Sequence, residues 1–327
     1  MSPSTRHRAT LAALRLATAA ALSLATTAAS AQVVGLGTTQ AGATNQLATV
    51  IAKVVSERGG VQMRPQPMAG VVQYAPLVNA GDIDFGVSNI VEARYVVQGR
   101  EIIATPSPNL RLVARLVPWY NGLVVKADSP IKSIRDLKGQ PTPAGFTGNP
   151  LGRVLMDGYL ANAGMRIGDT RQVLVPAFPR MFEMFKQGQL ATSIATIGSP
   201  VLKEWEASVG TIRFLNFDPA PQAVAALNEY IPGAYVVEVQ PAAGVIGVAT
   251  PTHMLVYDYV IFAGAKVADE VVGKVVEALY ANPDDLKAAS PLFRQFEPRE
   301  MARELGIPYH PGASKVYQAR GLLPAKR

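Results

Sequence analysis

The chain has 327 residues, of which 49% are hydrophobic and 17% are charged. This composition excludes a disordered or low-complexity chain, and the length predicts about two domains. Cysteine is absent, which excludes disulfide frameworks, thiolate zinc sites, cysteine nucleophiles and anchoring through a lipidated cysteine. The formal net charge of +7 is spread without a run of Lys or Arg, so nucleic acid is not an expected partner.

The first 31 residues have the pattern of a signal peptide. Arg6, Arg8 and Arg15 precede an Ala/Leu/Thr-rich run, and Ala29-Ser30-Ala31 supplies a small-x-small cleavage site. A membrane anchor is disfavoured because the run is shorter and more polar than the ~20 apolar residues that a span needs. The sequence therefore predicts cleavage before Gln32 and export of a soluble protein to the periplasm.

Short strands alternate with helices in the first half of the mature chain. We expect a strand at 32–37, an edge strand at 61–67 because of its prolines, and a third strand at 83–87. Apolar residues at helical spacing follow the first strand, and a helix over 71–79 precedes the third. This alternation predicts a parallel α/β architecture.

The second half repeats the scheme. The sequence predicts strands at 112–116, 122–125 and 190–197, and a returning strand at 254–262. Asn149 followed by Pro150 is a strong helix start, and the predicted helix runs to Leu160. Further helices are expected over 181–187, over an apolar stripe that begins at Val267, and over 299–305, with a last short helix after His310.

The sequence shows no constellation typical of an enzyme. His253 and His310 are not at metal-ligand spacing from other ligands, and neither a G-x-S-x-G elbow nor a P-loop occurs. Gly35-Leu-Gly37 fails to complete a dinucleotide fingerprint because position 40 is Gln. Asp82 and Asp84 are interpreted as solvated strand-end residues. We therefore expect a protein without catalytic residues, cofactor or metal.

Four turns rich in Gly, Thr, Ser and Asn connect a strand to a helix, namely Gly35–Gly42, Val87–Asn89, Gly145–Asn149 and Gly198–Pro200. Such turns leave backbone N–H groups free at helix N-termini, where a carboxylate binds well. In open α/β sheets they lie at the carboxyl ends of the strands, where ligands bind. Ordinary helix capping explains any single turn, but four of them favour a shared ligand site.

Several segments resemble solute receptors of TRAP transporters of the TAXI type. The most specific is the C-terminal stretch 305–313 with Tyr317 and Gly321-Leu322. The other segments that carry the resemblance are Gly35-Leu-Gly37-Thr38, residues 80–88, the crossover 123–139 and residues 251–262. Two departures concern the ligand: Gly42-Ala-Thr-Asn45 stands where the family often has an aromatic residue, and Ala191-Thr192 replaces its acidic residue.

The resemblance implies a two-lobed periplasmic binding protein of type II-like α/β fold, with hinge strands and an interlobe ligand cleft. Lobe I would comprise residues 32–122 and 256–327, and lobe II residues 123–255. Such a receptor captures a small organic acid, a dicarboxylate or an amino acid, and delivers it to the permease subunits of a TRAP transporter. The positions that match the family's ligand loops are Thr38, Thr39, Ser88, Asn89, Thr147, Gly148, Asn149 and Ser199.

Three further residues, and with less support a fourth, are candidates from their own chemistry. The rings of Trp119 and Tyr120 would cover an aliphatic part of a ligand, or would serve as hinge packing. Arg153, and with less support Arg94, lies near the start of a helix and offers bidentate binding to a carboxylate. In the turn before Pro150, we expect the Asn149 side chain to cap the helix and the remaining N–H groups to point outward.

Other functions remain open from the sequence. The two-lobed build also serves receptors of ABC importers and of tripartite tricarboxylate systems, and sensor subunits that present ligand to a membrane kinase. A transcription regulator would need a helix-turn-helix where this chain has its leader. An exported enzyme would need an acid–base or nucleophile constellation.

Overall fold

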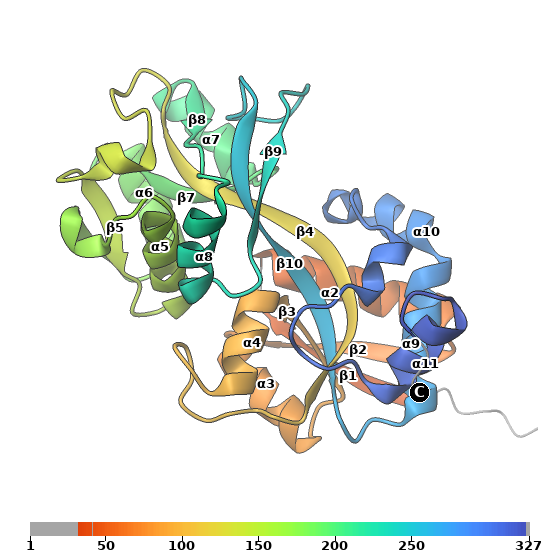
Figure 1. The fold of residues 1–327 in the computed structure, drawn as a ribbon. Helices are drawn as coiled ribbons and strands as arrows, with labels where there is room; N and C mark the ends of the chain where they lie inside the picture. The colour runs from red at the N-terminus through yellow and green to blue at the C-terminus, as the bar shows by residue number, and fades with distance from the viewer. Residues whose placement is uncertain (1–31, 41, 325–327) are drawn as a thin grey trace, which may run out of the picture. The chain divides into compact units, whose positions relative to one another are not determined.

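A mixed β-sheet organises the fold (Figure 1). The computed structural model describes residues 32–40 and 42–324, and the described residues from Val33 onward form one compact unit. The signal peptide predicted for residues 1–31 lies outside the described residues. The eight-stranded sheet has the order β2-β1-β3-β10-β4-β7, with β8 beside β4 and β9 beside β10. Its strands are β1 (Gln32–Thr39), β2 (Val61–Met68), β3 (Phe85–Asn89), β4 (Leu110–Lys126), β7 (Ser193–Thr196), β8 (Ile212–Phe214), β9 (Tyr235–Val239) and β10 (Thr252–Gly264).

The predicted α/β fold class is confirmed, but the prediction of a parallel sheet is wrong because the sheet is mixed. β1 and β3 are parallel, whereas β10 is antiparallel to both of its main neighbours, β3 and β4. The edge position predicted for the strand at 61–67 is correct, since β2 is the first strand in the order. Its prolines lack N–H donors, which an edge strand tolerates.

The two longest strands run side by side through the middle of the fold (Figure 1). β4 has 17 residues and β10 has 13, and they pair from Leu110↔Gly264 to Asn121↔Leu255. The two strands predicted at 112–116 and 122–125 are thus one. Pro118 pairs with Asp258 where the register shifts, so the missing N–H falls at an irregularity and the strand continues.

A second, two-stranded parallel sheet lies in the middle of the sequence, formed by β5 (Pro141–Gly145) and β6 (Arg171–Val175). The sequence did not reveal β6, α8 or β9. The helices are α2 (Gly42–Arg58), α3 (Val71–Ala80), α4 (Ile90–Gln98), α5 (Pro150–Asn162), α6 (Phe178–Lys186), α7 (Pro200–Val209), α8 (Pro221–Tyr230), α9 (Asp269–Ala281), α10 (Pro283–Ala289) and α11 (Pro311–Ala319). Short 3-10 turns occupy Ile134–Leu137, Ile167–Asp169, Pro291–Phe293 and Pro298–Ala302, and the last of these replaces the helix expected over 299–305.

Two apolar clusters stabilise these elements. One joins the predicted stripe of α9 to α2 and β1, and its Val272, Val275 and Leu279 are fully buried. The other extends from α3 and α4 to α5, α6 and α7, where Tyr159 and Trp205 are among the largest buried side chains. Burial of each such side chain contributes about 1.5–3 kcal/mol. Within the described ranges, none of the helices combines the length and apolar character of a membrane span.

Candidate ligand-binding site

Polar and aromatic side chains form a row across the central sheet. The pairing places Tyr259 of β10 opposite Asn89 of β3, and Tyr257 opposite Trp119 of β4. Asn121, two residues beyond Trp119, pairs with Thr196 at the end of β7. We call these six residues, Asn89, Tyr259, Tyr257, Trp119, Asn121 and Thr196, the polar belt. It joins the ends of β3 and β7, which precede two of the predicted ligand turns.

Hydrogen bonds and ring contacts hold the belt together. The Asn121 amide donates to the Tyr257 hydroxyl at 2.8 Å, and the hydroxyls of Thr44 and Tyr259 are 3.3 Å apart. The Trp119 and Tyr259 rings meet edge to face, with centroids 5.0 Å apart. Burial raises the pKa of both tyrosines, so their hydroxyls stay neutral donors and acceptors.

The end of β1 is hydrogen-bonded to the first turn of α2. Thr38 is buried and its hydroxyl donates to the Thr44 carbonyl oxygen at 3.1 Å. The Asn45 amide donates to the Thr39 carbonyl oxygen at 2.8 Å. The predicted ligand residues at this end of β1 therefore lie in a fixed wall, and the Thr38 side chain is already engaged.

Close packing explains the glycines of β1. A Cβ on Gly37 would lie 2.8 Å from the ring and Cβ of Tyr74, whose hydroxyl donates to the Val87 carbonyl oxygen at 2.5 Å. The Gly35 N–H donates to an Asp84 carboxylate oxygen at 2.8 Å, so the interpretation of Asp84 as merely solvated was wrong. The glycine-rich strand thus serves the approach of neighbouring side chains rather than a phosphate.

The end of β3 caps α4, and the first turn of α4 carries a carboxyl group with a raised pKa. Asn89 accepts from the Glu92 N–H at 2.9 Å and donates its amide to Glu92 Oε2 at 2.6 Å, while the Ser88 hydroxyl donates to the Asn89 carbonyl oxygen. Burial raises the pKa of Glu92 from 4.5 to about 7, although the bond from Asn89 works in the opposite direction. Glu92 also acts electrostatically on Tyr74, Tyr257 and Tyr259, which places it beside the belt.

The turn before α5 has a strained backbone. Gly145 and Phe146 both have positive φ, at 87° and 50°, and a buried aromatic residue rarely adopts this conformation. The Phe146 ring lies where a Cβ on Gly152 would stand, at 2.1 Å, so the glycine in α5 admits it. This arrangement fixes the position of the following residues, Thr147 to Asn149.

The prediction for the N–H groups of this turn was partly wrong. The Gly148 N–H donates to the Pro176 carbonyl oxygen at 2.8 Å, and the Asn149 N–H to that of Phe146 at 3.0 Å. The Asn149 side chain makes no capping bond. Two of the expected free donors are therefore occupied, because the chain after β6 closes against this turn and supplies a backbone acceptor that local sequence does not show.

Side chains of the second pair of turns have no bonding partner in the part of the chain that the structure describes. This holds for Thr147, Asn149 and Ser199. Thr147 is exposed, and the other two are partly exposed. These side chains are free to bind a ligand, in contrast to Thr38, Ser88 and Asn89.

The three remaining candidates have different surroundings. Trp119 belongs to the belt, whereas the neighbouring Tyr120 is half-buried and hydrogen-bonded to Gln295. Arg153 forms ion pairs with Glu101 at 2.9 Å and with Asp157 at 3.5 Å. The belt residues Asn121, Tyr257 and Tyr259 were not predicted, since their meeting depends on the β4–β10 register.

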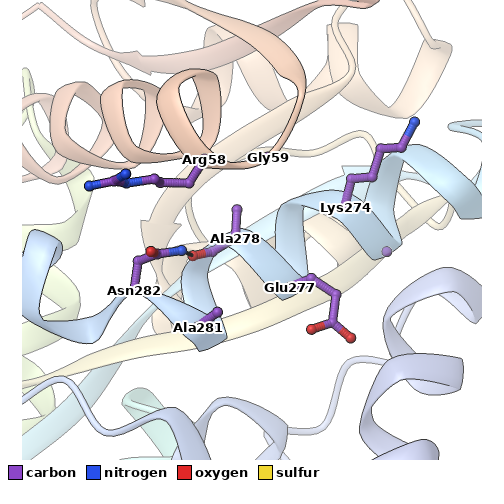
Figure 2. Close-up of a pocket in the computed structure, with 8 residues that line it drawn as sticks. Arg58, Gly59, Lys274, Glu277, Ala278, Ala281 and Asn282 are labelled. Atoms are coloured by element: carbon purple, nitrogen blue, oxygen red, sulfur yellow. Dashed lines mark hydrogen bonds between the residues drawn. The ribbon is translucent and has the colours of Figure 1, made fainter.

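Two surface pockets lie away from these residues. One, of about 440 Å³, is lined by Arg58 and Gly59 at the end of α2 and by residues of α9 and Asn282, which follows α9 (Figure 2). The other, of about 220 Å³, adjoins Gly81 and Lys266. Neither contains a predicted ligand residue. Among the described residues, His, Asp and Glu form no group of three or more that would hold a metal.

A family model described as the NMT1-like family matches residues 36–321. The chain belongs to the NMT1-like family. Among solved structures, it is similar to a TctC solute-binding protein from Polaromonas, with TM-score 0.54 and 14% identity over 90% of this chain and 96% of that chain. It is also similar to a protein described as a periplasmic transporter, with TM-score 0.54 and 13% identity over 90% and 95% of the two chains.

A third similar structure is PhnD1 from Prochlorococcus marinus in complex with methylphosphonate, with TM-score 0.50 and 12% identity over 89% and 99% of the two chains. These similarities extend over nearly the whole of each chain. The NMT1-like protein therefore has the α/β fold of periplasmic solute-binding proteins.

Proposed function

We propose that this protein is a periplasmic solute-binding receptor that captures a small organic acid and delivers it to a membrane permease. The acid, a dicarboxylate or an amino acid, would bind between two lobes, residues 32–122 with 256–327 and residues 123–255. Family membership and the shared fold support the receptor role. The observation that carries the proposal is the unbonded polar side chains at the starts of α5 and α7, within the described chain.

These side chains match the chemistry of a carboxylate. A helix N-terminus carries partial positive charge, and α5 is 13 residues long, so an anion gains from its dipole without a buried cation. The Thr147 hydroxyl adds a donor to this position. The first pair of turns and the polar belt would form the preformed opposite wall, where Tyr257 and Tyr259 offer neutral hydroxyls.

The finer proposal is a TAXI-type receptor for a TRAP transporter. It rests on the C-terminal stretch, where His310 caps α11 by accepting from the Gly312 N–H and Tyr317 donates to the Val113 carbonyl oxygen at 2.7 Å. The second candidate is a receptor of a tripartite tricarboxylate or ABC system, favoured by the similarity to the TctC protein. Identifying which permease gene adjoins this one separates the two, because each system has its own permease type.

Calorimetric titration tests the receptor role. We expect saturable one-to-one binding of at least one of succinate, glutarate, L-glutamate and fumarate, and recovery of the acid unchanged after incubation, as a receptor without catalytic residues requires. Native mass spectrometry of freshly purified protein should reveal a co-purified acid. Titrations without heat for all four acids, together with no bound small molecule, would contradict the proposal.

The proposed lobes predict a hinge motion. β4 and β10 both continue from the first group of residues into the second, near Gly122 and Met254, so they are the expected hinge strands. Small-angle scattering should give a smaller radius of gyration at saturating acid. An unchanged radius despite demonstrated binding would indicate a receptor that is already closed.

A further inference from the structure

Arg94, on α4, is an arginine without an acidic partner. In residues 32–40 and 42–324 it forms neither an ion pair nor a hydrogen bond, and its Nε is buried without an acceptor. It lies five residues after Asn89, the N-cap of the same helix. An arginine that is partly withdrawn from water loses hydration, and it recovers this loss only when it meets an anion or a carbonyl group.

Two glycines flank the guanidinium group. A Cβ on Gly306 would lie 3.1 Å from Arg94 Cζ, and a Cβ on Gly233 would lie 3.1 Å from Nη1. Both glycines have positive φ, at 74° and 86°, which disfavours any side chain there. The planar group therefore lies between two stretches of bare backbone, and a side chain on either glycine would crowd it.

The segment around Gly233 is held in place independently of Arg94. The Gly233 N–H donates to Asn228 Oδ1 at 2.8 Å, and the Asn228 amide donates to the Ala234 carbonyl oxygen at 2.9 Å. The Tyr95 hydroxyl on α4 donates to the Tyr230 carbonyl oxygen just before this turn. Contacts other than those of Arg94 therefore hold α4 beside residues 231–234 in this structure.

Other arginines of the fold show how a structural guanidinium is satisfied. Buried Arg115 lies 2.8 Å from a carboxylate oxygen of Asp258, and Arg153 is bound by Glu101 and Asp157. Arg94 has no such carboxylate. Its forked donors match the two oxygens of a carboxylate, and a ligand can supply what the protein does not.

We propose that Arg94 binds a second carboxylate of the captured organic acid, distinct from the one at the start of α5, between residues 231–234 and residues 305–307. This inference rests on the receptor function proposed above. Gly233 belongs to the proposed lobe II, and Arg94 and Gly306 to the proposed lobe I. An acid held at Arg94 therefore contacts both lobes, which is how a ligand stabilises the closed state of a two-lobed receptor.

The inference predicts which property of the acid Arg94 recognises. A carboxylate accepts two hydrogen bonds from the guanidinium and carries the opposite charge, whereas an amide of the same shape accepts one and carries none. Wild-type protein should therefore prefer the acid to its amide, and this preference should depend on Arg94. A residue that only supports the fold would instead weaken acid and amide binding alike.

The experiment is a calorimetric comparison of succinate, glutarate, L-glutamate and fumarate with succinamate, glutaramate, L-glutamine and fumaramate, in each of which one carboxylate is replaced by an amide. We expect Arg94→Gln to weaken binding of the bound acid at least tenfold, and binding of its amide by less than threefold. Arg94→Lys should give an intermediate loss for the acid, because it keeps the charge but lacks the fork. The melting temperature of each variant shows that it is folded.

Arg100→Gln is the matched control. Arg100 is exposed and lies just after the same helix. Its replacement by Gln removes the same charge, so this variant should bind the acid like the wild type. If Arg94→Gln keeps the wild-type preference for acid over amide, or weakens binding of both ligands equally, the inference is overturned while the proposed function stands. Wild-type protein that binds none of the acids contradicts the proposed function and the inference together.

Discussion

The two pairs of turns at the ends of the strands differ in how they are bonded. In the first pair, at Thr38 and at Ser88-Asn89, the side chains are buried and hydrogen-bonded to neighbouring residues. In the second pair, at Thr147 and Ser199, the side chains are at least partly exposed and lack partners in the described part of the chain. Both pairs contain Gly, Thr, Ser and Asn.

Residue composition alone therefore does not distinguish a turn whose side chains are already hydrogen-bonded from a turn whose side chains are available to a ligand. The first pair lies in the central sheet, where β10 and α3 pack against it, so its hydroxyls and amides are used to hold the sheet and α4 together. The second pair follows β5, in the two-stranded sheet, and β7, the last strand in the order of the central sheet. The expected division is that changes in the first pair reduce stability, while changes in the second reduce affinity.

The largest effect on stability is expected at Gly37, in the buried part of β1. Gly37→Ala places a Cβ 2.8 Å from Tyr74, which is well inside van der Waals contact and involves the Tyr74 Cβ as well as its ring. Such overpacking should lower the free energy of unfolding by about 3 kcal/mol. Gly70→Ala is the control, since nothing lies within 4 Å of the added Cβ. Urea denaturation of both variants measures the difference, and equal stabilities would show that the wall yields easily.

Glu92 makes the free energy of unfolding depend on pH. Burial raises its pKa from 4.5 to about 7, so between these values the folded protein holds a proton that the unfolded chain releases. The free energy of unfolding therefore falls as pH rises from 4.5 to 7, by about 2–3 kcal/mol from this group. Glu92→Gln cannot ionise and should lack this decrease. Urea melts of both proteins at pH 5 and pH 8 check it, and parallel profiles would contradict the raised pKa.

Thr147 and Ser88 allow the expected division between effects on affinity and effects on stability to be measured. Thr147→Ala should weaken acid binding by about 1–3 kcal/mol, or ten- to a hundredfold, with stability nearly unchanged. Ser88→Ala should lower stability by about 1 kcal/mol, because it removes the buried bond to the Asn89 carbonyl oxygen. Titration calorimetry and thermal melting of both variants test the division. Full affinity in Thr147→Ala would place the acid elsewhere, at Arg153 or at the Thr38-Thr39 turn.

The smallest effect on stability is expected at Asn149. Although it precedes a helix, its side chain makes no capping bond, so Asn149→Ala should change stability by less than about 0.5 kcal/mol. Asn89→Ala removes a true cap and should lower stability by about 1–2 kcal/mol. Thermal melting of both variants compares two asparagines of the same nominal role. A large loss in Asn149→Ala would mean that it caps α5 in solution.

The sequence predicted the elements with strong local signals. The apolar stripe of α9, the proline-marked edge strand β2 and the start of α5 at Pro150 all follow from short-range patterns, and the structure confirms them. The single strand β4 was missed because Pro118 normally interrupts a strand, and only its pairing with Asp258 at an irregularity allows continuation. β6 was missed because most of its side chains are not buried, which leaves no alternating pattern.

The candidate site was predictable as turns but not as contacts. Glycine, threonine and asparagine at strand ends marked the four turns correctly. Tyr257, Tyr259 and Asn121 could not be assigned, because their meeting depends on the register of strands more than a hundred residues apart in the chain. The bond from Gly148 to Pro176 is of the same kind, since a distant segment occupies a donor that local sequence left free.

Hydrogen exchange of the backbone, followed with and without the most tightly bound of the four acids, tests the account most directly. The account predicts that saturating acid slows exchange in residues 145–150 and 197–200, where the turns gain a bonded ligand, while residues 37–39 and 88–89 exchange as before. Protection that rises only at residues 37–39 and 88–89, or at none of these turns despite demonstrated binding, would contradict it.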